Sequence, residues 1–145
     1  MALVEKSVLV EYSAQQMYAL VEDIERYPEF LPWCGGARVL KREGSLVRAA
    51  IDIDFRGIKQ HFSTENRMDS PRLIEMKLVQ GPFRQLDGSW RFKALGDDAC
   101  KIEFRLHYEF SSRLLERLVG AVFHYIANTF VEAFVKRAQN LYGMR

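Results

Sequence analysis

Apolar and polar residues in the C-terminal part of the chain, residues 111–145, recur at spacings of three and four positions. This period predicts one α-helix of about nine turns, because residues three and four apart share a side of a helix. Polar residues such as Glu116, His124 and Glu132 form a narrow stripe, and the apolar stripe is wide. A wide apolar stripe needs a large apolar surface to cover it. The only candidate in this chain is the run of alternating segments that precedes the helix.

Those segments alternate between apolar and polar positions with a period of two, which predicts β-strands. The predicted strands cover residues 47–56, 58–65, 74–79, 89–94 and 100–110. Turn signals separate them, and short connections between neighbouring strands imply antiparallel hairpins. Each strand has one apolar and one polar face, as expected when a single helical layer covers a sheet.

Before these strands, the pattern predicts a first strand and a short helix. Residues 8–12 alternate, and Ser13 with Gln16 has the form of a capping box. We expect this helix to end near Tyr27, because Pro28 disfavours helical geometry in the residue before it. The predicted fold class is therefore α+β, with an antiparallel sheet and a long C-terminal helix. A long helix across a curved sheet can enclose a cavity, which makes hydrophobic-ligand binding the first functional hypothesis.

Composition removes several classes of function. A chain of 145 residues is expected to form one domain, and its net charge of +2 is too small to indicate a DNA partner. Cys34 and Cys100 lie far apart in the sequence, which favours two free thiols in a reducing compartment. Residues 1–12 lack the shape of a signal peptide, and no uncharged apolar run reaches about 18 residues. We therefore expect a cytoplasmic protein, and we expect any membrane contact to be peripheral, at the inner membrane.

The pattern does not assemble a catalytic or metal site. His61 and His107 fall on polar strand faces and His124 on the polar stripe of the helix, so all three are expected to be solvated. Asp52 and Asp54 could act as paired carboxylates, but they also lie on the outer face. No two metal-ligating side chains share a face at ligand spacing, and no glycine-rich phosphate loop is present. We therefore expect no enzyme activity, no metal and no cofactor other than a bound ligand.

The aromatic residues leave two interpretations open. Tyr27, Trp33, Trp90, Phe123 and Phe130 are among those expected to point inward. They can form an ordinary packed core, or they can line an apolar pocket with a few polar anchors, the usual form of a small-molecule site. The periodicity is compatible with both.

Three stretches of the sequence carry a family resemblance. They are residues 10–18 followed by 27–34 (Tyr-Pro-Glu-Phe-Leu-Pro-Trp-Cys), residues 81–92 (beginning Gly-Pro-Phe-Arg), and residues 106–110 continuing into the helix. Together they resemble the coenzyme Q-binding proteins of the START-like, polyketide cyclase superfamily. The Gly-Pro-Phe-Arg block is similar to bacterial members, which include the ribosome association toxin, more than to mitochondrial members.

The resemblance spans nearly the whole chain, and it implies a single START-like lipid-binding domain over residues 1–145. The implied fold is a helix-grip, in which a curved antiparallel sheet wraps around the C-terminal helix. The implied function is to hold ubiquinone or a similar isoprenoid lipid in an apolar tunnel and to carry it for respiration without transforming it. An isoprenoid tail gains about 25 cal/mol for each Å² removed from water, so an enclosing cavity suffices and catalytic groups are not needed.

The inward strand and helix positions, taken together with the resemblance, predict the residues of this tunnel. Its lining is expected to be Ile51, Ile53, Phe62, Met76, Leu78, Trp90, Phe92, Phe104, Phe123, Ile126 and Phe130. Its entrance is expected at Tyr27, Pro28, Phe30, Leu31, Pro32 and Trp33. Aromatic rings in the entrance could shield the lipid tail or contact a membrane interface. The alternative is that they only plug the end of the sheet.

The resemblance also implies a second role, in which the protein binds the large ribosomal subunit and blocks subunit association. That role would use basic side chains scattered on the outer face of the sheet: Arg48, Arg56, Lys59, Arg67, Lys93, Lys101 and Arg105. Acidic residues such as Asp52, Glu65 and Glu103 interleave with them, which is equally typical of a solvated surface. Enzyme activity, as in cyclases and dehydratases of the wider superfamily, would need ionisable groups facing the cavity, and the inward positions offer almost none.

Overall fold

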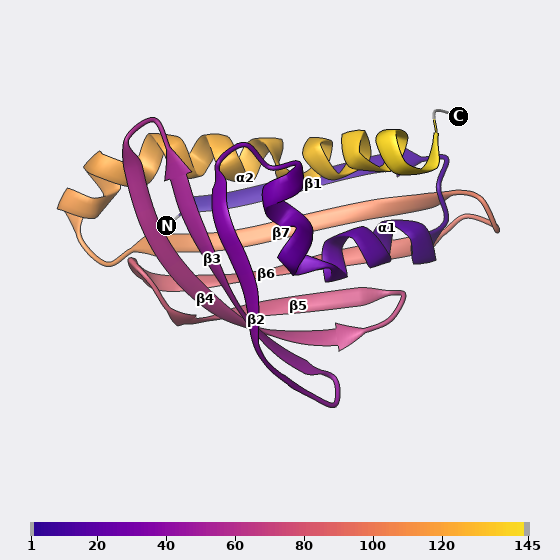
Figure 1. The fold of residues 1–145 in the computed structure, drawn as a ribbon, viewed down its shortest axis with the longest axis horizontal. Coiled ribbons are helices and arrows are strands. Elements are labelled where there is room, and N and C mark those ends of the chain that lie inside the picture. Colours follow the sequence, from indigo (N-terminus) through magenta and orange to yellow (C-terminus); the bar gives the residue numbers. More distant parts are fainter. Residues whose placement is uncertain (1, 144–145) are drawn as a thin grey trace.

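The computed structural model describes residues 2–143 and contains one sheet, two α-helices and a short 3-10 helix (Figure 1). The elements in chain order are β1 (Ala2–Val10), α1 (Ala14–Glu22), the 3-10 helix η1 (Ile24–Glu29), β2 (Cys34–Glu43), β3 (Leu46–Phe55), β4 (Ile58–Asp69), β5 (Leu73–Gln80), β6 (Phe83–Ala94), β7 (Cys100–Phe110) and α2 (Arg113–Tyr142). This arrangement confirms the predicted α+β class.

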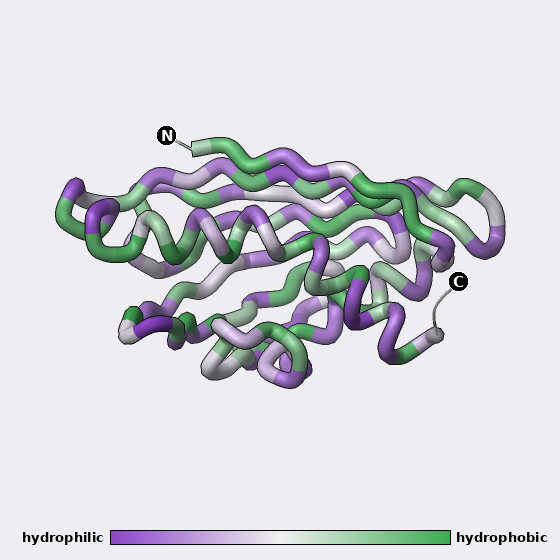
Figure 2. The backbone as a smooth tube through the Cα atoms, turned by 90° about the horizontal axis from the view of Figure 1, so that it is seen from above, coloured by the Kyte–Doolittle hydropathy of each residue, from purple (hydrophilic) through white to green (hydrophobic). Residues whose placement is uncertain are grey.

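The sheet is antiparallel throughout, and its strand order is β1-β7-β6-β5-β4-β3-β2. Strands β2 to β7 follow one another as hairpins, and β1 pairs with β7 at the far edge, with Val4 opposite Leu106. The sheet bends so strongly that β3 and β4 run across the direction of β6 and β7, and α2 lies along its concave side (Figure 1). Hydrophobic and hydrophilic positions alternate along the strands (Figure 2), so one face of the sheet packs inward.

The sequence pattern missed β2. This strand lies at the sheet edge, and within it only Cys34 is buried. Its pairing with β3 shifts register twice, between Cys34 and Gly36 and between Val39 and Lys41. An edge strand with irregular pairing and little burial has no strict apolar face, so a search for alternation does not detect it.

The N-terminal boundaries also differ from the prediction. Strand β1 begins at Ala2, well before residue 8. Helix α1 ends at Glu22, and the chain up to Glu29 continues as η1. The predicted capping box is present, because the Ser13 hydroxyl accepts from the Gln16 amide at 3.0 Å and the Gln16 side chain accepts from the Ser13 amide at 2.9 Å.

Helix α2 buries one side against the sheet, including Phe123, Ile126 and Phe134. By length and composition it is apolar enough to cross a membrane, and a third (33%) of its most apolar window is buried in the fold. The expectation that the sheet covers the whole apolar stripe is wrong at Tyr125 and Leu141, which are 47% and 52% exposed, and at the first turns. There Leu114 and Leu118 remain 65% and 59% exposed, because the helix begins beyond the sheet.

Candidate functional site

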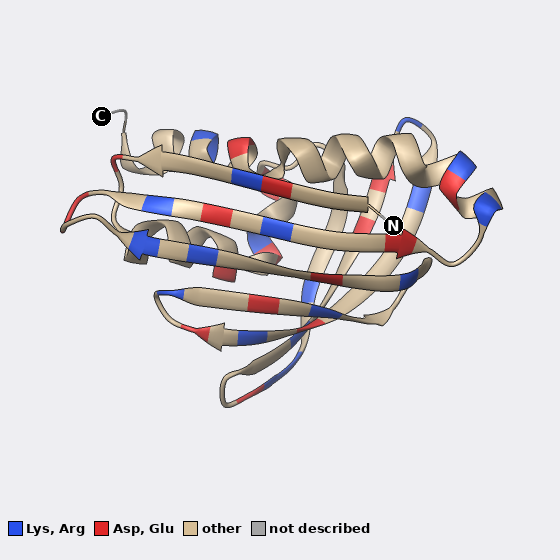
Figure 3. Ribbon diagram, turned by 180° about the vertical axis from the view of Figure 1, so that it is seen from behind, with Lys and Arg blue, Asp and Glu red and all other residues tan. Residues whose placement is uncertain are grey.

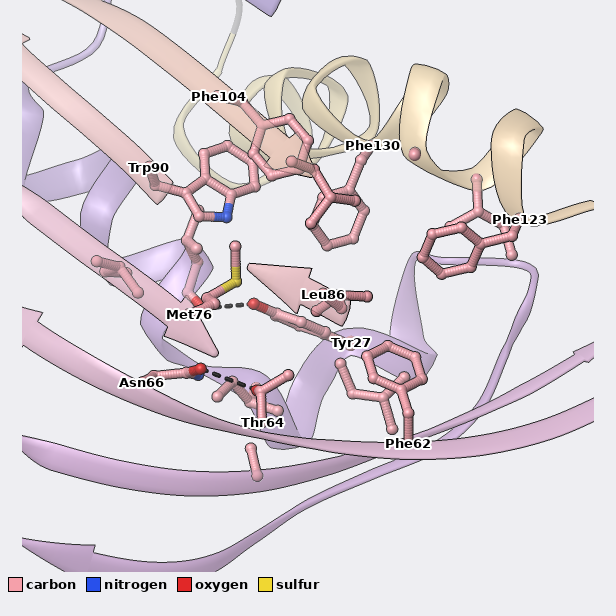
Figure 4. Close-up of a pocket in the computed structure, with 18 of the residues that line it drawn as sticks. Tyr27, Phe62, Thr64, Asn66, Met76, Leu86, Trp90, Phe104, Phe123 and Phe130 are labelled. Atoms are coloured by element: carbon pink, nitrogen blue, oxygen red, sulfur yellow. Dashed lines mark hydrogen bonds between the residues drawn. The ribbon is translucent and has the colours of Figure 1, made fainter. Parts of the chain in front are cut away.

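An apolar cavity lies between the concave face of the sheet, η1 and α2 (Figure 4). Its volume is about 80 Å³. Five strands contribute to its wall, together with α1, η1, the segment before β2, and α2. The lining residues are Val21, Ile24, Tyr27, Trp33, Ala49, Ile51, Phe62, Thr64, Asn66, Met68, Ile74, Met76, Leu86, Trp90, Phe104, Leu106, Phe123, Ile126, Ala127 and Phe130.

Aromatic rings form one wall of this cavity. The Phe130 ring of α2 lies 5.6 Å from Trp90 and 5.7 Å from Phe104, measured between ring centroids. It also lies 6.3 Å from Tyr27 and 5.9 Å from Trp33, which come from η1 and the segment that follows it. Phe130 therefore joins the helix, the sheet and the η1 segment at one point. A substitution there is expected to change both packing and the shape of the cavity.

Two polar side chains interrupt the apolar lining. Thr64 and Asn66 project from β4 and are 7% and 5% exposed. The Thr64 hydroxyl donates to the Asn66 carbonyl oxygen Oδ1 at 2.8 Å, as the dashed line in Figure 4 marks. Among the described lining residues, none has a charged side chain. The cavity can therefore accept a neutral, mainly apolar molecule, whereas a buried anion or cation would lack a partner.

Tyr27 also contributes a polar atom, its hydroxyl oxygen, but this atom is already engaged. Its hydroxyl donates to the backbone carbonyl of Val21 at 2.5 Å. Complete burial, with smaller contributions from Cys34 and Asp23, raises the pKa of Tyr27 far above its ordinary value. The hydroxyl therefore stays protonated and bound to the backbone, and it is not set up for proton transfer at the cavity.

The structure brings most of the predicted tunnel residues together around this cavity. Those that line it are Ile51, Phe62, Met76, Trp90, Phe104, Phe123, Ile126 and Phe130. Whether they contact a ligand stays a prediction.

Three predicted tunnel residues lie outside the lining. Phe92 is buried under α1, where its ring is 5.6 Å from Tyr18. Ile53 is buried farther along β3, beyond Ile51. Leu78 is half-buried where β5 has left its pairing with β6. The sheet bends, so residues on one face of it do not all reach the same internal volume.

The predicted entrance is mostly closed by its own packing. Tyr27, Leu31 and Trp33 are 4%, 1% and 4% exposed, and Phe30 is half-buried with its ring 5.1 Å from Phe134. Pro28 and Pro32 are exposed, and Tyr27 and Trp33 line the cavity. This packing is compatible with the plugged arrangement named above as the alternative, and whether the segment admits a ligand stays a prediction. The buried rings do not face solvent, where a membrane could meet them.

The lining also contains residues that the sequence analysis did not select. Asn66 and Met68 continue the inward series of β4 after Phe62 and Thr64. If the alternation had been followed for four more positions after Thr64, both residues would have been predicted. Val21 and other lining residues belong to elements outside the sheet. Local periodicity gives no signal that such residues contact the cavity.

The histidines and acidic residues lie elsewhere. On the outer face, His61 Nδ1 lies 2.5 Å from Asp52 Oδ1, and both side chains are exposed. His124 Nδ1 lies 3.3 Å from the Tyr108 hydroxyl. Between residues 2 and 143, no three His, Cys, Asp or Glu side chains are grouped so that they could hold a metal ion. None of these groups lines the cavity.

Sequence comparison finds relatives that are named either as ribosome association toxins or as coenzyme Q-binding proteins. It is 43% identical over 145 residues to the ribosome association toxin RatA of Escherichia coli strain K12, covering 100% of this chain and 92% of that protein. It is 28% identical over 142 residues to the mitochondrial coenzyme Q-binding protein COQ10 homolog B of Xenopus laevis, covering 95% of this chain and 58% of that protein.

Structural comparison shows the same fold in more distant proteins. The ZhuI aromatase/cyclase from Streptomyces sp. R1128 has a TM-score of 0.83 at 15% identity, covering 95% of this chain and 93% of that chain. A START superfamily protein from Mycobacterium smegmatis has a TM-score of 0.77 at 24% identity, covering 96% and 98%. These likenesses confirm the predicted helix-grip fold and say nothing further about function. Residues 10–135 match the family described as polyketide cyclase / dehydrase and lipid transport, and the chain therefore belongs to this START-like family.

Proposed function

We propose that this protein binds an isoprenoid quinone, ubiquinone or a similar lipid, in the cavity under α2 and carries it without transforming it. The observation that carries the proposal is a lining of apolar and aromatic side chains with one buried polar pair and no charged group among its described residues. Small-molecule sites usually combine an apolar wall with a few polar groups in this way. The relative named as a coenzyme Q-binding protein supports the same ligand class.

Carriage is favoured over catalysis by what faces the cavity. Cyclisation or dehydration needs a group that accepts or donates a proton within hydrogen-bond reach of the substrate. The polar groups of the described lining are those of Thr64 and Asn66, the indole N–H groups of Trp33 and Trp90, and a Tyr27 hydroxyl that is bound to the Val21 carbonyl. None of these exchanges a proton near neutral pH.

Ligand entry requires the cavity to widen. Its volume of about 80 Å³ is smaller than an engineered cavity of about 150 Å³ that holds benzene, so a quinone ring with its tail does not fit without movement. Met68 and Met76 line the cavity, and methionine side chains adapt their shape more easily than branched or aromatic ones. Each 100 Å² of apolar ligand surface buried contributes about 2.5 kcal/mol, which can offset such rearrangement.

The direct test is to extract the purified, folded protein with organic solvent and to identify bound lipids by mass spectrometry and ultraviolet absorption. We expect an isoprenoid quinone at close to one molecule per chain. Protein that is folded, never exposed to detergent and free of lipid, and that also fails to bind added quinone, would refute the proposal.

A second candidate is association with the ribosome in the cytoplasm, which is favoured by the 43% identity to a ribosome association toxin along the whole chain. The outer face of the sheet has no uniform charge that would support this role. Acidic and basic positions alternate along its strands (Figure 3). Several bases there are paired: Arg48 lies 3.2 Å from Glu65, and Lys93 lies 3.3 Å from Glu103. Exposed pairs of this kind contribute little energy and leave less charge for an RNA partner.

Cosedimentation with purified ribosomal subunits over a range of salt concentrations tests this second role. Binding that weakens steeply as salt rises would indicate contacts to RNA phosphates. Binding that occurs equally with lipid-loaded and lipid-free protein would show that the two roles are independent. If the protein stays in the supernatant at low salt with both subunits, ribosome association is excluded.

A further inference from the structure

The outward side of the first half of α2 carries an apolar strip. It consists of four residues, exposed or half-buried, that follow one another at steps of four, four and three positions: Leu114, Leu118, Val122 and Tyr125. These steps place them on one side of the helix. Residues 118–131 contain no Lys, Arg, Asp or Glu, and Figure 3 shows this part of α2 without charged positions. Single exposed apolar residues are common, whereas a continuous strip of them indicates a binding surface. We call it the α2 strip.

The turn between β3 and β4 extends the α2 strip with an aromatic ring and a base. The Phe55 ring stacks on Tyr125, with 5.8 Å between the ring centroids and 8° between the ring planes, and the turn lies beside α2 in Figure 1. The guanidinium carbon of Arg56 lies 4.8 Å from the Phe55 centroid and 5.7 Å from that of Tyr125. Arg56 has a φ of 52°, in the left-handed region where turns usually carry glycine or asparagine. Backbone energy is therefore lost to hold an arginine at this place.

The charges around the α2 strip are basic. Arg113 and Arg117 are exposed and lie one turn apart at the start of α2. Neither these two nor Arg56 forms an ion pair within residues 2–143. Glu116 is two positions before Leu118 and therefore points to the other side of the helix. Apolar side chains beside unpaired arginines are typical of a surface that binds a bilayer with anionic head groups.

The α2 strip also ends close to the predicted entrance of the cavity. A groove of about 730 Å³ beside α2 has Tyr125, Pro32 and Trp33 in its wall, and Trp33 lines the cavity as well. A protein that carries an isoprenoid lipid must exchange it with a bilayer, an argument that rests on the proposed function. Contact through the α2 strip would bring the segment of Pro32 and Trp33 near that bilayer.

We propose that the α2 strip, with Arg56, Arg113 and Arg117 at its border, docks the protein on membranes that contain anionic lipids. Leu114 and Leu118 enter the interfacial region, and the arginines contact head-group phosphates. This surface differs from the one expected from the sequence, which placed membrane contact at the aromatic rings of the entrance.

The test measures flotation of the protein with vesicles of phosphatidylcholine alone and of equal parts phosphatidylcholine and phosphatidylglycerol. We expect binding to the mixed vesicles and much weaker binding to phosphatidylcholine. The double variant Leu114→Gln/Leu118→Gln is expected to bind mixed vesicles about tenfold more weakly, because two apolar side chains are removed from the interface. Leu9→Gln/Leu95→Gln is the matched control, since it makes the same change at two exposed leucines on β1 and in the β6–β7 turn, and it is expected to bind like the unmodified protein.

The arginines are tested on the same vesicles. Each of Arg113→Gln and Arg117→Gln is expected to weaken binding to the mixed vesicles by about fivefold and to leave the weak binding to phosphatidylcholine unchanged. Binding of the unmodified protein is expected to fall as salt rises, because salt screens the attraction to the head groups. Equal binding to both kinds of vesicle would refute the role of the arginines.

The outcomes separate this inference from the proposed function. Folded, unmodified protein that does not float with mixed vesicles refutes docking, as does equal binding by the α2 strip variant and its control. If the strip variant instead loses self-association or cosedimentation with ribosomal subunits, and the unmodified protein ignores vesicles, the strip serves another partner and the inference is wrong. Solvent extraction of the same samples reports the bound lipid independently. Protein that holds a quinone without binding vesicles keeps the proposed function and overturns docking, whereas vesicle binding by protein that cannot take up quinone does the reverse.

Discussion

Filling the cavity from α2 gives a sharp test of where a ligand binds. Ala127 is 2% exposed and lines the cavity, so Ala127→Leu places three additional carbon atoms into it. Ala121 lies on the same helix but is exposed, which makes Ala121→Leu a matched control with the same chemical change. Lipid binding is expected to be lost in the first variant and kept in the second.

The expected effect on stability follows from the size of the cavity. At about 24 cal/mol per Å³, a cavity of about 80 Å³ corresponds to about 2 kcal/mol of missing packing. Ala127→Leu recovers part of this energy and loses part of it to strain, so we expect unfolding free energy to stay the same or to rise by up to about 2 kcal/mol. An ordinary packed core without usable space would instead be destabilised by about 1–3 kcal/mol through overpacking.

Two measurements on each variant check this reasoning. Urea denaturation gives the unfolding free energy, and solvent extraction with mass spectrometry gives the bound lipid. Stable Ala127→Leu protein without lipid, beside Ala121→Leu protein with lipid, is the expected result. Equal lipid in both variants would place the ligand outside this cavity and would refute the site.

Three further predictions concern stability. Phe130→Ala is expected to cost about 3–5 kcal/mol in urea denaturation, because the ring packs against Trp90, Phe104 and Tyr27; a loss below about 1 kcal/mol would contradict this packing. Ser13→Ala is expected to cost about 1 kcal/mol, since the hydroxyl caps α1, and Ser13→Gly should cost less. Burial raises the pKa of Cys100 to about 11 from 9.0, so the unfolded chain loses this proton first and stability should fall as pH rises from 9.0 towards 11. Denaturation midpoints at three pH values in this window measure that slope, and a slope that Cys100→Ala leaves unchanged would argue against the assignment.

The sequence by itself determined the elements that have a regular apolar face. The period of α2 and the alternation of β3 to β7 are local properties, and the capping box of Ser13 and Gln16 needs only residues three positions apart. The motifs at residues 27–34 and 81–92 indicated the family, and the comparisons confirmed it. Strand β2 was missed because its pairing is irregular and its residues are mostly exposed.

The tertiary structure decided which inward residues share a cavity. Ile51 and Ile53 lie on one face of one strand, yet only Ile51 reaches the cavity, because the bend of the sheet separates them. Tyr27 and Trp33 are buried by contacts with Phe130, which is about a hundred residues away in the chain. The residues that lie opposite Asn66 are Val47 on β3 and Met76 on β5. Periodicity reports which side of an element is apolar, whereas curvature and long-range pairing fix the volume that those sides enclose.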